Sequence, residues 1–241
     1  MKRKTQRTST TFDKSKNLLS ASSGFAMQEA YKTLRTNVAF SLPGDRSRCI
    51  GIISANRSEG KSTISLNLAI SLAQIEKKVI IIDCDMRLPT VASKLGMTKG
   101  RLGLSDYLTG DNGFEDLPII RNSELGIDII PAGTIPPDPT KLIESPQMSN
   151  LLNILKEIYD YVIVDFPPVG MVSDAAILSS VIDGYLIVVR HESSELSELD
   201  ETIRQMNFAN ANIMGFVYND KPSTKKFYKK NSKYYYYEYK K

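Results

Sequence analysis

The residues best suited to chemistry lie in the loop at positions 55–63, whose sequence is ANRSEGKST. The apolar run RCIGIIS precedes this loop and predicts a buried strand, and residues 63–74 carry apolar side chains at helical spacing. A loop that ends in Gly-Lys-Ser between a strand and a helix presents backbone N–H groups and a helix N-terminus to an anion. The segment therefore predicts a phosphate-binding loop in which Ala55 replaces the usual first glycine.

The chemistry of such a loop gives a role to two of its side chains. Lys61 is expected to bridge the β- and γ-phosphates of a nucleotide, and the Ser62 hydroxyl is expected to bind Mg²⁺. The other residues expected to contact the nucleotide are Asn56, Arg57, Ser58, Glu59, Gly60 and Thr63. The alternative is a strand-to-helix turn with an incidental Gly-Lys pair, which the surrounding strand and helix disfavour.

Three aspartates follow apolar runs elsewhere in the chain. Asp83 and Asp85 lie in the segment IIIDCDMR, and Asp165 ends the segment YVIVD. The carboxyl ends of parallel strands line the ligand crevice of an open α/β sheet, so these carboxylates are expected beside the phosphate-binding loop. Each aspartate alone fits a helix cap equally well. Together they favour Mg²⁺ and proton chemistry around one nucleotide.

Tyrosines are concentrated at the end of the chain. A run of four consecutive tyrosines among lysines cannot pack one face against a core. The alternative role is a stacking tail for nucleic acid or glycan. The tyrosines of this cluster are Tyr228, Tyr234, Tyr235, Tyr236, Tyr237 and Tyr239.

Short β-branched runs alternate with amphipathic stretches from residue 48 onward. The expected strands cover 48–54, 78–83, 126–131, 161–165, 184–190 and 213–218. The expected helices cover 24–41, 63–74, 148–158, 173–181 and 195–208, and four prolines predict a loop at 132–146. Such alternation predicts right-handed βαβ units. The fold class is therefore α/β, with a mostly parallel, doubly wound sheet flanked by helices.

Length and charge divide the 241 residues into three parts. The expected domain spans 21–220, between a basic flexible N-terminus at 1–20 and a Lys/Tyr-rich tail at 221–241. The tail carries eight lysines and one glutamate, net +7, and residues 1–20 carry net +5, so the domain between them is acidic, at net −8. A nucleic-acid-binding domain usually carries its basic charge on the folded body, so no nucleic-acid partner is expected.

Two further features predict where the protein works. The chain has two cysteines, too few for a disulfide framework, which fits a reducing compartment. No apolar run approaches the ~20 residues that a membrane span requires. The sequence therefore predicts a cytoplasmic protein.

The three motifs bear a family resemblance. The loop at 55–62, the segment 80–87 and the strand end at 161–165 resemble the Walker A, Walker A′ and Walker B motifs of the bacterial tyrosine kinases, or BY-kinases. Within this family, the chain is similar to the separate cytoplasmic kinases of capsular and exopolysaccharide assembly in Gram-positive bacteria. Partition and cell-division ATPases share the fold, but they carry a signature lysine where this chain has Asn56.

The resemblance implies a catalytic set. Lys61 would hold the phosphates of ATP, Asp83 is the candidate base for a tyrosine hydroxyl, and Arg87 would join the nucleotide contacts. The residues that would support Mg²⁺, directly or through a bound water, are Ser62, Asp85 and Asp165. The product would be phosphotyrosine in the C-terminal cluster, formed between subunits. Two other functions remain open at this point: a regulatory ATPase of the partitioning type, and a nucleotide-gated scaffold for a membrane partner.

An assembly motif is also implied. Glu29, Lys32 and Arg35 resemble the E-x-x-R-x-x-R oligomerisation motif of the family, with Lys32 in place of the first arginine. At helical spacing the three side chains share one face, so they could form contacts in a ring-like homo-oligomer. A solvated helix face is the alternative.

The resemblance also implies partners outside the chain. The implied activator is a membrane-embedded protein of the polysaccharide co-polymerase type, which would recruit the kinase to the inner face of the cell membrane. A phosphotyrosine phosphatase would reverse the modification.

Overall fold

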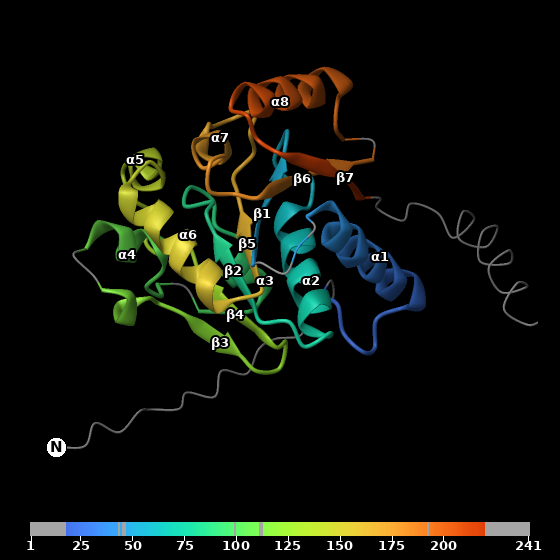
Figure 1. The fold of residues 1–241 in the computed structure, drawn as a ribbon, viewed down its shortest axis with the longest axis horizontal. Coiled ribbons are helices and arrows are strands. Elements are labelled where there is room, and N and C mark those ends of the chain that lie inside the picture. The colour runs from blue at the N-terminus through green and yellow to red at the C-terminus, as the bar shows by residue number, and fades with distance from the viewer. Residues whose placement is uncertain are drawn as a thin grey trace, which may run out of the picture.

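A seven-stranded sheet forms the centre of the molecule, in the order β3-β4-β2-β5-β1-β6-β7 (Figure 1). The computed structural model describes residues 18–42, 44, 47–98, 100–110, 113–191 and 193–219. The strands are β1 (Arg48–Ser54), β2 (Val79–Asp83), β3 (Ile120–Asn122), β4 (Ile127–Ile130), β5 (Tyr161–Asp165), β6 (Gly184–Arg190) and β7 (Ile213–Asn219).

Every strand pair of the sheet is parallel except the pair of β3 with β4. The central strands β1, β2 and β5 are apolar and buried along nearly their whole length, as expected for strands with both faces covered. Successive side chains of a strand point to opposite faces. Ile80 and Ile82 accordingly pack in one core, whereas Ile81 packs in the other.

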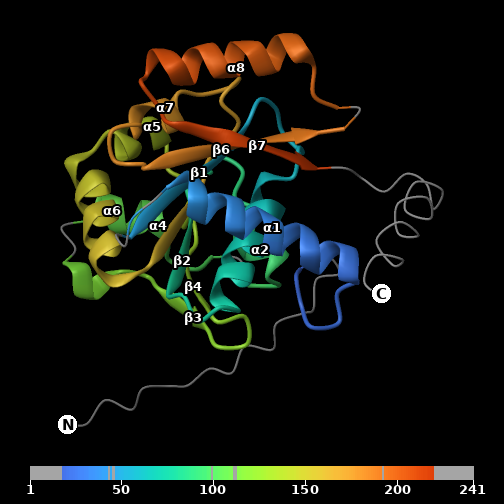
Figure 2. The same ribbon diagram turned by 45° about the vertical axis from the view of Figure 1, so that its right-hand side comes forward.

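Helices cover both faces of the sheet (Figures 1 and 2). One core contains side chains from α1 and α2, and the other contains side chains from α6, α7 and α8. The longer helices are α1 (Phe25–Ser41), α2 (Lys61–Ala73), α6 (Pro146–Ile158) and α8 (Leu196–Phe208). The shorter helices are α3 (Val91–Lys94), α4 (Leu104–Thr109), α5 (Pro139–Ile143), α7 (Asp174–Ile177) and the 3₁₀ turn η1 (Phe114–Asp116).

The predicted fold class is confirmed, and three local predictions are corrected. The three-residue edge strand β3 was not expected, and it runs antiparallel to its neighbour. The expected proline loop at 132–146 contains helix α5, which Pro139 starts at its first turn and Asp138 caps. The helix expected at 173–181 ends after one turn, at Ile177.

The folded part begins earlier than residue 21. Leu19 is only 2% exposed, and its N–H donates to Asn67 Oδ1 at 2.7 Å. The folded domain therefore includes Leu19, two residues before the boundary expected at residue 21. The Lys/Tyr-rich segment with its six tyrosines lies outside the described residues. Among the described residues, no helix is long and apolar enough to cross a membrane.

Candidate functional site

The loop between β1 and α2 has the geometry that phosphate binding needs. The helix begins at Lys61, and Gly60 before it adopts φ +102°, a left-handed conformation that favours glycine. A Cβ at Gly60 would also lie 2.2 Å from the side-chain amide of Asn219. The backbone conformation therefore favours the glycine of the Gly-Lys-Ser motif, and any larger residue there would displace the Asn219 amide.

Lys61, the first residue of α2, is largely buried. The residue is only 8% exposed. Burial lowers the pKa of the Lys61 ammonium, while the nearby carboxylates of Asp165 and Asp85 act in the opposite direction. A cation of low exposure, partly compensated by acids, is a strong binding partner for a phosphate.

Asp83 and Asp165 end the neighbouring strands β2 and β5, where they are paired in register. The two residues are 0% and 1% exposed. Burial is the main cause that raises the pKa of Asp165 to about 6, and burial together with the charge of Asp165 raises the pKa of Asp83. Two carboxyl groups buried side by side favour shared protons or a bound cation.

The two carboxyl groups differ in their hydrogen bonds. Asp83 accepts the N–H of Asp85 at 3.2 Å and the N–H of Val91 at 3.1 Å, one at each oxygen. Asp165 Oδ1 accepts the Ser65 hydroxyl at 2.9 Å, and its Oδ2 is buried with no hydrogen-bond partner in the described part of the chain. Asp83 is therefore held by the backbone, whereas Asp165 has an oxygen left for a ligand. The role of Asp83 as a base stays a prediction.

The residues around this oxygen fit Mg²⁺. Carboxylates, a hydroxyl and nucleotide phosphates are the ligands that Mg²⁺ uses, together with several waters. Asp165 ends β5, Asp85 follows the end of β2 by two residues, and Ser62 lies in the first turn of α2, which the loop after β1 leads into. The strands β2, β5 and β1 are consecutive in the sheet. Within the described ranges, no cluster of three or more His, Cys, Asp or Glu residues would hold a metal by itself. A site of this composition would bind Mg²⁺ together with a nucleotide.

Two hydroxyls of the site were not predicted. Thr90 Oγ1 lies 2.6 Å from Ser62 Oγ and donates to it, which links the loop after β2 to the phosphate-binding loop. Ser65, one helical turn after Ser62, also donates to the Lys61 carbonyl at 3.0 Å. The position of Ser65 on the same helix face as Ser62 was a usable signal, whereas nothing in the sequence places Thr90 there.

The Arg87 side chain has different partners from the ones expected. It was predicted to contact the nucleotide, but its guanidinium forms an ion pair of 2.5 Å with the fully buried Asp174. The same guanidinium donates to Thr140 Oγ1 at 2.8 Å. The arginine therefore connects the loop after β2 with α5 and α7, and its part in nucleotide binding stays a prediction.

Glu59 was predicted to contact the nucleotide, but its side chain is bound within the protein itself. The carboxylate is fully buried, accepts the N–H of Asn56 at 3.0 Å and receives the hydroxyl of Ser194. Asn56 in turn contacts Glu198 through its side-chain amide. Arg57 and Ser58 are exposed on the loop. Side chains of this loop therefore support its shape, and its backbone N–H groups are the remaining candidates for contacts with phosphate.

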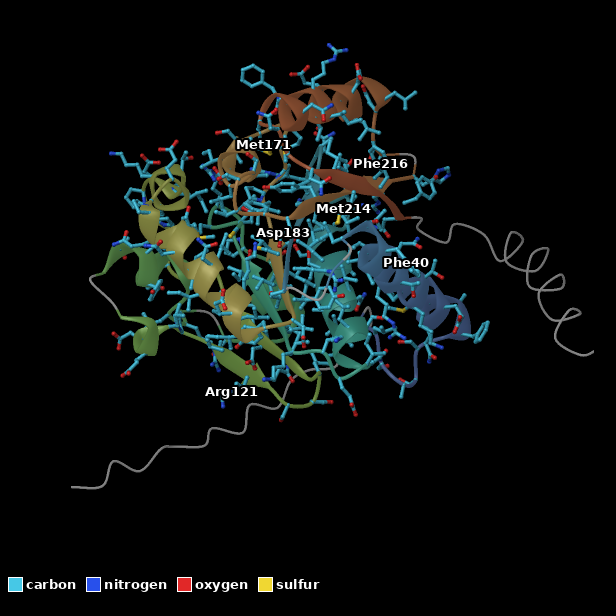
Figure 3. All side chains as sticks on the ribbon, viewed as in Figure 1. Phe40, Arg121, Met171, Asp183, Met214 and Phe216 are labelled. Carbon is cyan, nitrogen blue, oxygen red and sulfur yellow. The ribbon has the colours of Figure 1, made fainter. Side chains whose placement is uncertain are left out.

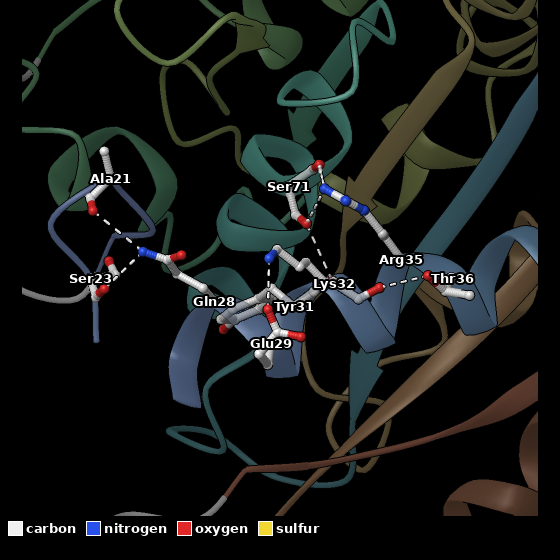
Figure 4. Close-up of polar contacts among 9 residues, drawn as sticks. All are labelled: Ala21, Ser23, Gln28, Glu29, Tyr31, Lys32, Arg35, Thr36 and Ser71. Atoms are coloured by element: carbon white, nitrogen blue, oxygen red, sulfur yellow. Dashed lines mark hydrogen bonds and ion pairs between the residues drawn. The ribbon is translucent and has the colours of Figure 1, made fainter. Parts of the chain in front are cut away.

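The predicted oligomerisation residues lie on α1 (Figure 4). Lys32 Nζ contacts Glu29 Oε1 at 2.6 Å, and both side chains are about half exposed. Arg35 instead donates to the buried Ser71 of α2, at 2.7 Å to its carbonyl and 3.3 Å to its hydroxyl. Two of the three side chains are thus available to a second subunit, whereas Arg35 holds α1 on α2.

Comparison with known proteins identifies a matching domain family and related tyrosine kinases. The AAA domain family matches residues 47–214. Tyrosine-protein kinase CpsD of Streptococcus agalactiae is 33% identical over 192 residues, which cover 80% of this chain and 82% of that protein.

Two solved structures show the same fold. The kinase domain of the Escherichia coli tyrosine kinase ETK superposes with a TM-score of 0.76 at 31% identity, over 82% of this chain and 77% of that one. The septum site-determining protein MinD from Pyrococcus horikoshii, complexed with Mg-ADP, gives 0.61 at 25% identity, over 72% and 70%. The relatives agree with the phosphate-binding loop and with the aspartates at the ends of β2 and β5. The chain therefore belongs to the bacterial tyrosine kinases; it is similar to CpsD and is built on a P-loop nucleotide-binding domain.

Proposed function

We propose that the protein is an ATP-dependent autokinase that phosphorylates the C-terminal tyrosine cluster of a neighbouring subunit. One observation carries this proposal. Lys61, which has low exposure, and the paired carboxyl groups of Asp83 and Asp165 lie together at the carboxyl ends of the central strands. Such a site suits phosphoryl transfer, which depends on positioning and charge stabilisation. The six tyrosines from Tyr228 to Tyr239 supply acceptors in the same chain.

The proposed step moves one phosphoryl group. The tyrosine hydroxyl oxygen forms a bond to the γ-phosphorus, and the bond from that phosphorus to the bridging oxygen of ADP breaks. The hydroxyl proton passes to a carboxylate of the site, for which Asp83 is the candidate. Lys61 stabilises the negative charge that gathers on the phosphate oxygens.

Mg²⁺ is the metal that this proposal includes. When bound with ATP it would supply charge neutralisation at the phosphates. Ser62, Asp85 and Asp165 would hold it. The buried Oδ2 of Asp165, which has no hydrogen-bond partner among the described residues, supports that choice. The support from relatives is the Mg-ADP complex of MinD, which shares the fold.

Asn56 separates this proposal from its nearest alternative. Partitioning ATPases carry a signature lysine at that position of the loop, and the Asn56 side chain contacts Glu198 of the same chain. The likeness to MinD is also weaker than the likeness to the kinase domain of ETK. A regulatory ATPase and a nucleotide-gated scaffold are therefore less favoured.

The proposal extends to a cellular setting. The kinase would regulate the synthesis and export of capsular or exopolysaccharide, as the resemblance to the family suggests. It would assemble as a ring-like homo-oligomer, act at the inner face of the membrane through a co-polymerase-type activator, and be reset by a phosphotyrosine phosphatase.

One experiment distinguishes the three functions. Purified protein is incubated with Mg-ATP, and phosphotyrosine, released phosphate and intact mass are measured together. A kinase gains about 80 Da for each phosphoryl group on its tail tyrosines. Phosphate release without a mass change would indicate an ATPase, and nucleotide binding without either product would indicate a scaffold.

A further inference from the structure

The carboxyl ends of β6 and β7 lie against the outer side of the phosphate-binding loop. These two parallel strands are neighbours at the edge of the sheet (Figure 2), and their last residues, Arg190 and Asn219, are partners in register. The backbone N–H of His191 donates to the Asn219 carbonyl at 3.2 Å, which closes the pair. Two donor side chains are therefore fixed side by side at one point.

Both donors reach carbonyl groups of the loop. Arg190 Nη1 donates to the Ser58 carbonyl at 2.7 Å, and Asn219 Nδ2 donates to the Glu59 carbonyl at 2.8 Å. These carbonyls belong to consecutive peptide groups. The paired strand ends thus hold two adjacent peptides of the loop from one side.

Peptide geometry gives these bonds a consequence for phosphate binding. A trans peptide is planar, and its N–H points opposite to its C=O; the described chain contains no cis peptide bond. With the Ser58 and Glu59 carbonyls directed at β6 and β7, the N–H groups of Glu59 and Gly60 point the other way. Oriented N–H groups of this kind form the concave anion site of such loops.

A third contact fixes the same part of the loop. The Ser194 hydroxyl accepts the N–H of Arg190 at 2.9 Å and donates to the buried carboxylate of Glu59. That carboxylate also accepts the N–H of Asn56. The segment after β6 therefore holds the side chain of Glu59, while the strand ends hold the backbone on both sides of it.

We propose that Arg190 and Asn219 are positioning residues that keep the phosphate-binding loop in its nucleotide-binding shape. They act through the loop and not on the nucleotide itself. Asn219 is also the last residue of β7. The inference rests on the proposed function to the extent that the loop binds ATP.

The structure offers a matched control for Asn219. Asn212, at the other end of β7, donates its side-chain amide to the Asp183 carbonyl, also at 2.8 Å (Asp183 is labelled in Figure 3). Asn219→Ala and Asn212→Ala each remove one amide-to-carbonyl bond of equal length. Only the first bond ends on the phosphate-binding loop, so a structural effect and a positioning effect can be separated.

The test measures binding of a fluorescent ADP to the full-length protein, together with the melting temperature. Loss of one such hydrogen bond is expected to weaken ADP binding by about three- to tenfold in Asn219→Ala. Asn212→Ala is expected to leave ADP affinity unchanged while lowering the melting temperature by a similar amount. With an added tyrosine peptide as acceptor, Asn219→Ala is expected to raise the KM for ATP and leave kcat nearly unchanged.

Other outcomes overturn the inference. Equal ADP affinities in wild type and Asn219→Ala, or equal losses in both asparagine variants, would show that the bond has no specific effect on the loop. If Asn219→Ala fails to fold, Arg190→Ala is the second test, because it removes only an exposed guanidinium contact. Arg190→Ala is expected to weaken ADP binding, and an unchanged affinity would contradict the inference. Failure of the wild type to bind ADP would instead contradict the proposed function.

Discussion

Asp83 and Asp165 are paired in register at the ends of adjacent parallel strands, and both are buried. The pairing places two carboxyl groups close together beside Lys61. Whether both groups are ionised therefore depends on whether a cation is bound near them. Burial raises the pKa of both groups, and the charge of Asp165 adds to the rise at Asp83. The free protein therefore carries an electrostatic cost at this site, and a cation bound there would reduce that cost.

The first prediction concerns the pH dependence of stability. The pKa of Asp165 is about 6 in the folded protein against 3.8 for an ordinary aspartate, so between these values the folded state binds more protons than the unfolded state. The free energy of unfolding of the nucleotide-free protein should therefore fall as the pH rises through this window. Asp165→Asn removes the titration of this carboxyl group, while that of Asp83 remains, and the variant should be the more stable protein above pH 7.

Urea unfolding of both proteins between pH 5 and pH 7.5 measures this difference. The advantage of Asp165→Asn should grow as the pH is raised, because only the wild type must bury an ionised carboxylate at that position. An advantage that stays constant across the range would contradict the prediction.

The second prediction concerns Lys61. Lys61→Met should reduce tail phosphorylation by about a hundredfold or more, because the phosphates lose their buried cation. The fold should persist, since methionine has a similar length and removes a cation of low exposure. Lys77→Met, at an exposed lysine just after α2, is the control and should retain activity. Normal phosphotyrosine in a folded Lys61→Met protein would show that the loop does not act as proposed.

The third prediction concerns Arg87. Arg87→Ala leaves the buried carboxylate of Asp174 without its cation, and it should lower the free energy of unfolding by about 3 kcal/mol even without nucleotide. Arg57→Ala, at an exposed arginine of the phosphate-binding loop, should have almost no such effect. Urea unfolding compares the three proteins. Equal stability of Arg87→Ala and wild type would mean that the arginine is free to serve the nucleotide.

The fourth prediction concerns assembly through α1. Replacing Glu29 and Lys32 together by alanine should shift the protein toward monomer in light scattering, with little change in melting temperature. Arg35→Ala should lower the stability by about 1–2 kcal/mol, because it removes charge-assisted bonds to Ser71. An unchanged oligomer in the double variant would show that this face is solvated.

The fifth prediction concerns release of the assembly by phosphorylation. Each phosphotyrosine adds about −1.5 to −2 charges, so three of them would offset most of the positive charge of the segment 221–241. The phosphorylated protein should dissociate to monomers, whereas a variant with phenylalanine at all six tail tyrosines should stay assembled with ATP. Sedimentation of the two forms compares them directly. The same oligomer in both would show that tail charge does not control assembly.

The sequence by itself determined the sheet core and the position of the site. Six of the seven strands were predicted, because buried parallel strands are continuous apolar runs between amphipathic helices. The edge strand β3 was not predicted, since three residues carry too little periodicity. The site followed from chain order, because the residues after β1, β2 and β5 must meet at one edge once the strands are parallel and adjacent.

Only the tertiary structure decided which partner each polar side chain takes. Arg87 pairs with Asp174, Arg35 with Ser71, and Asn219 with the Glu59 carbonyl, across separations of 87, 36 and 160 residues. No spacing rule reaches over such distances, because these contacts depend on how helices and strand ends pack in space. The burial of Lys61 was also decided by the tertiary structure. The sequence places a lysine at the end of the loop, but only the packing of the folded chain makes it a cation of low exposure among the carboxylates of Asp165 and Asp85.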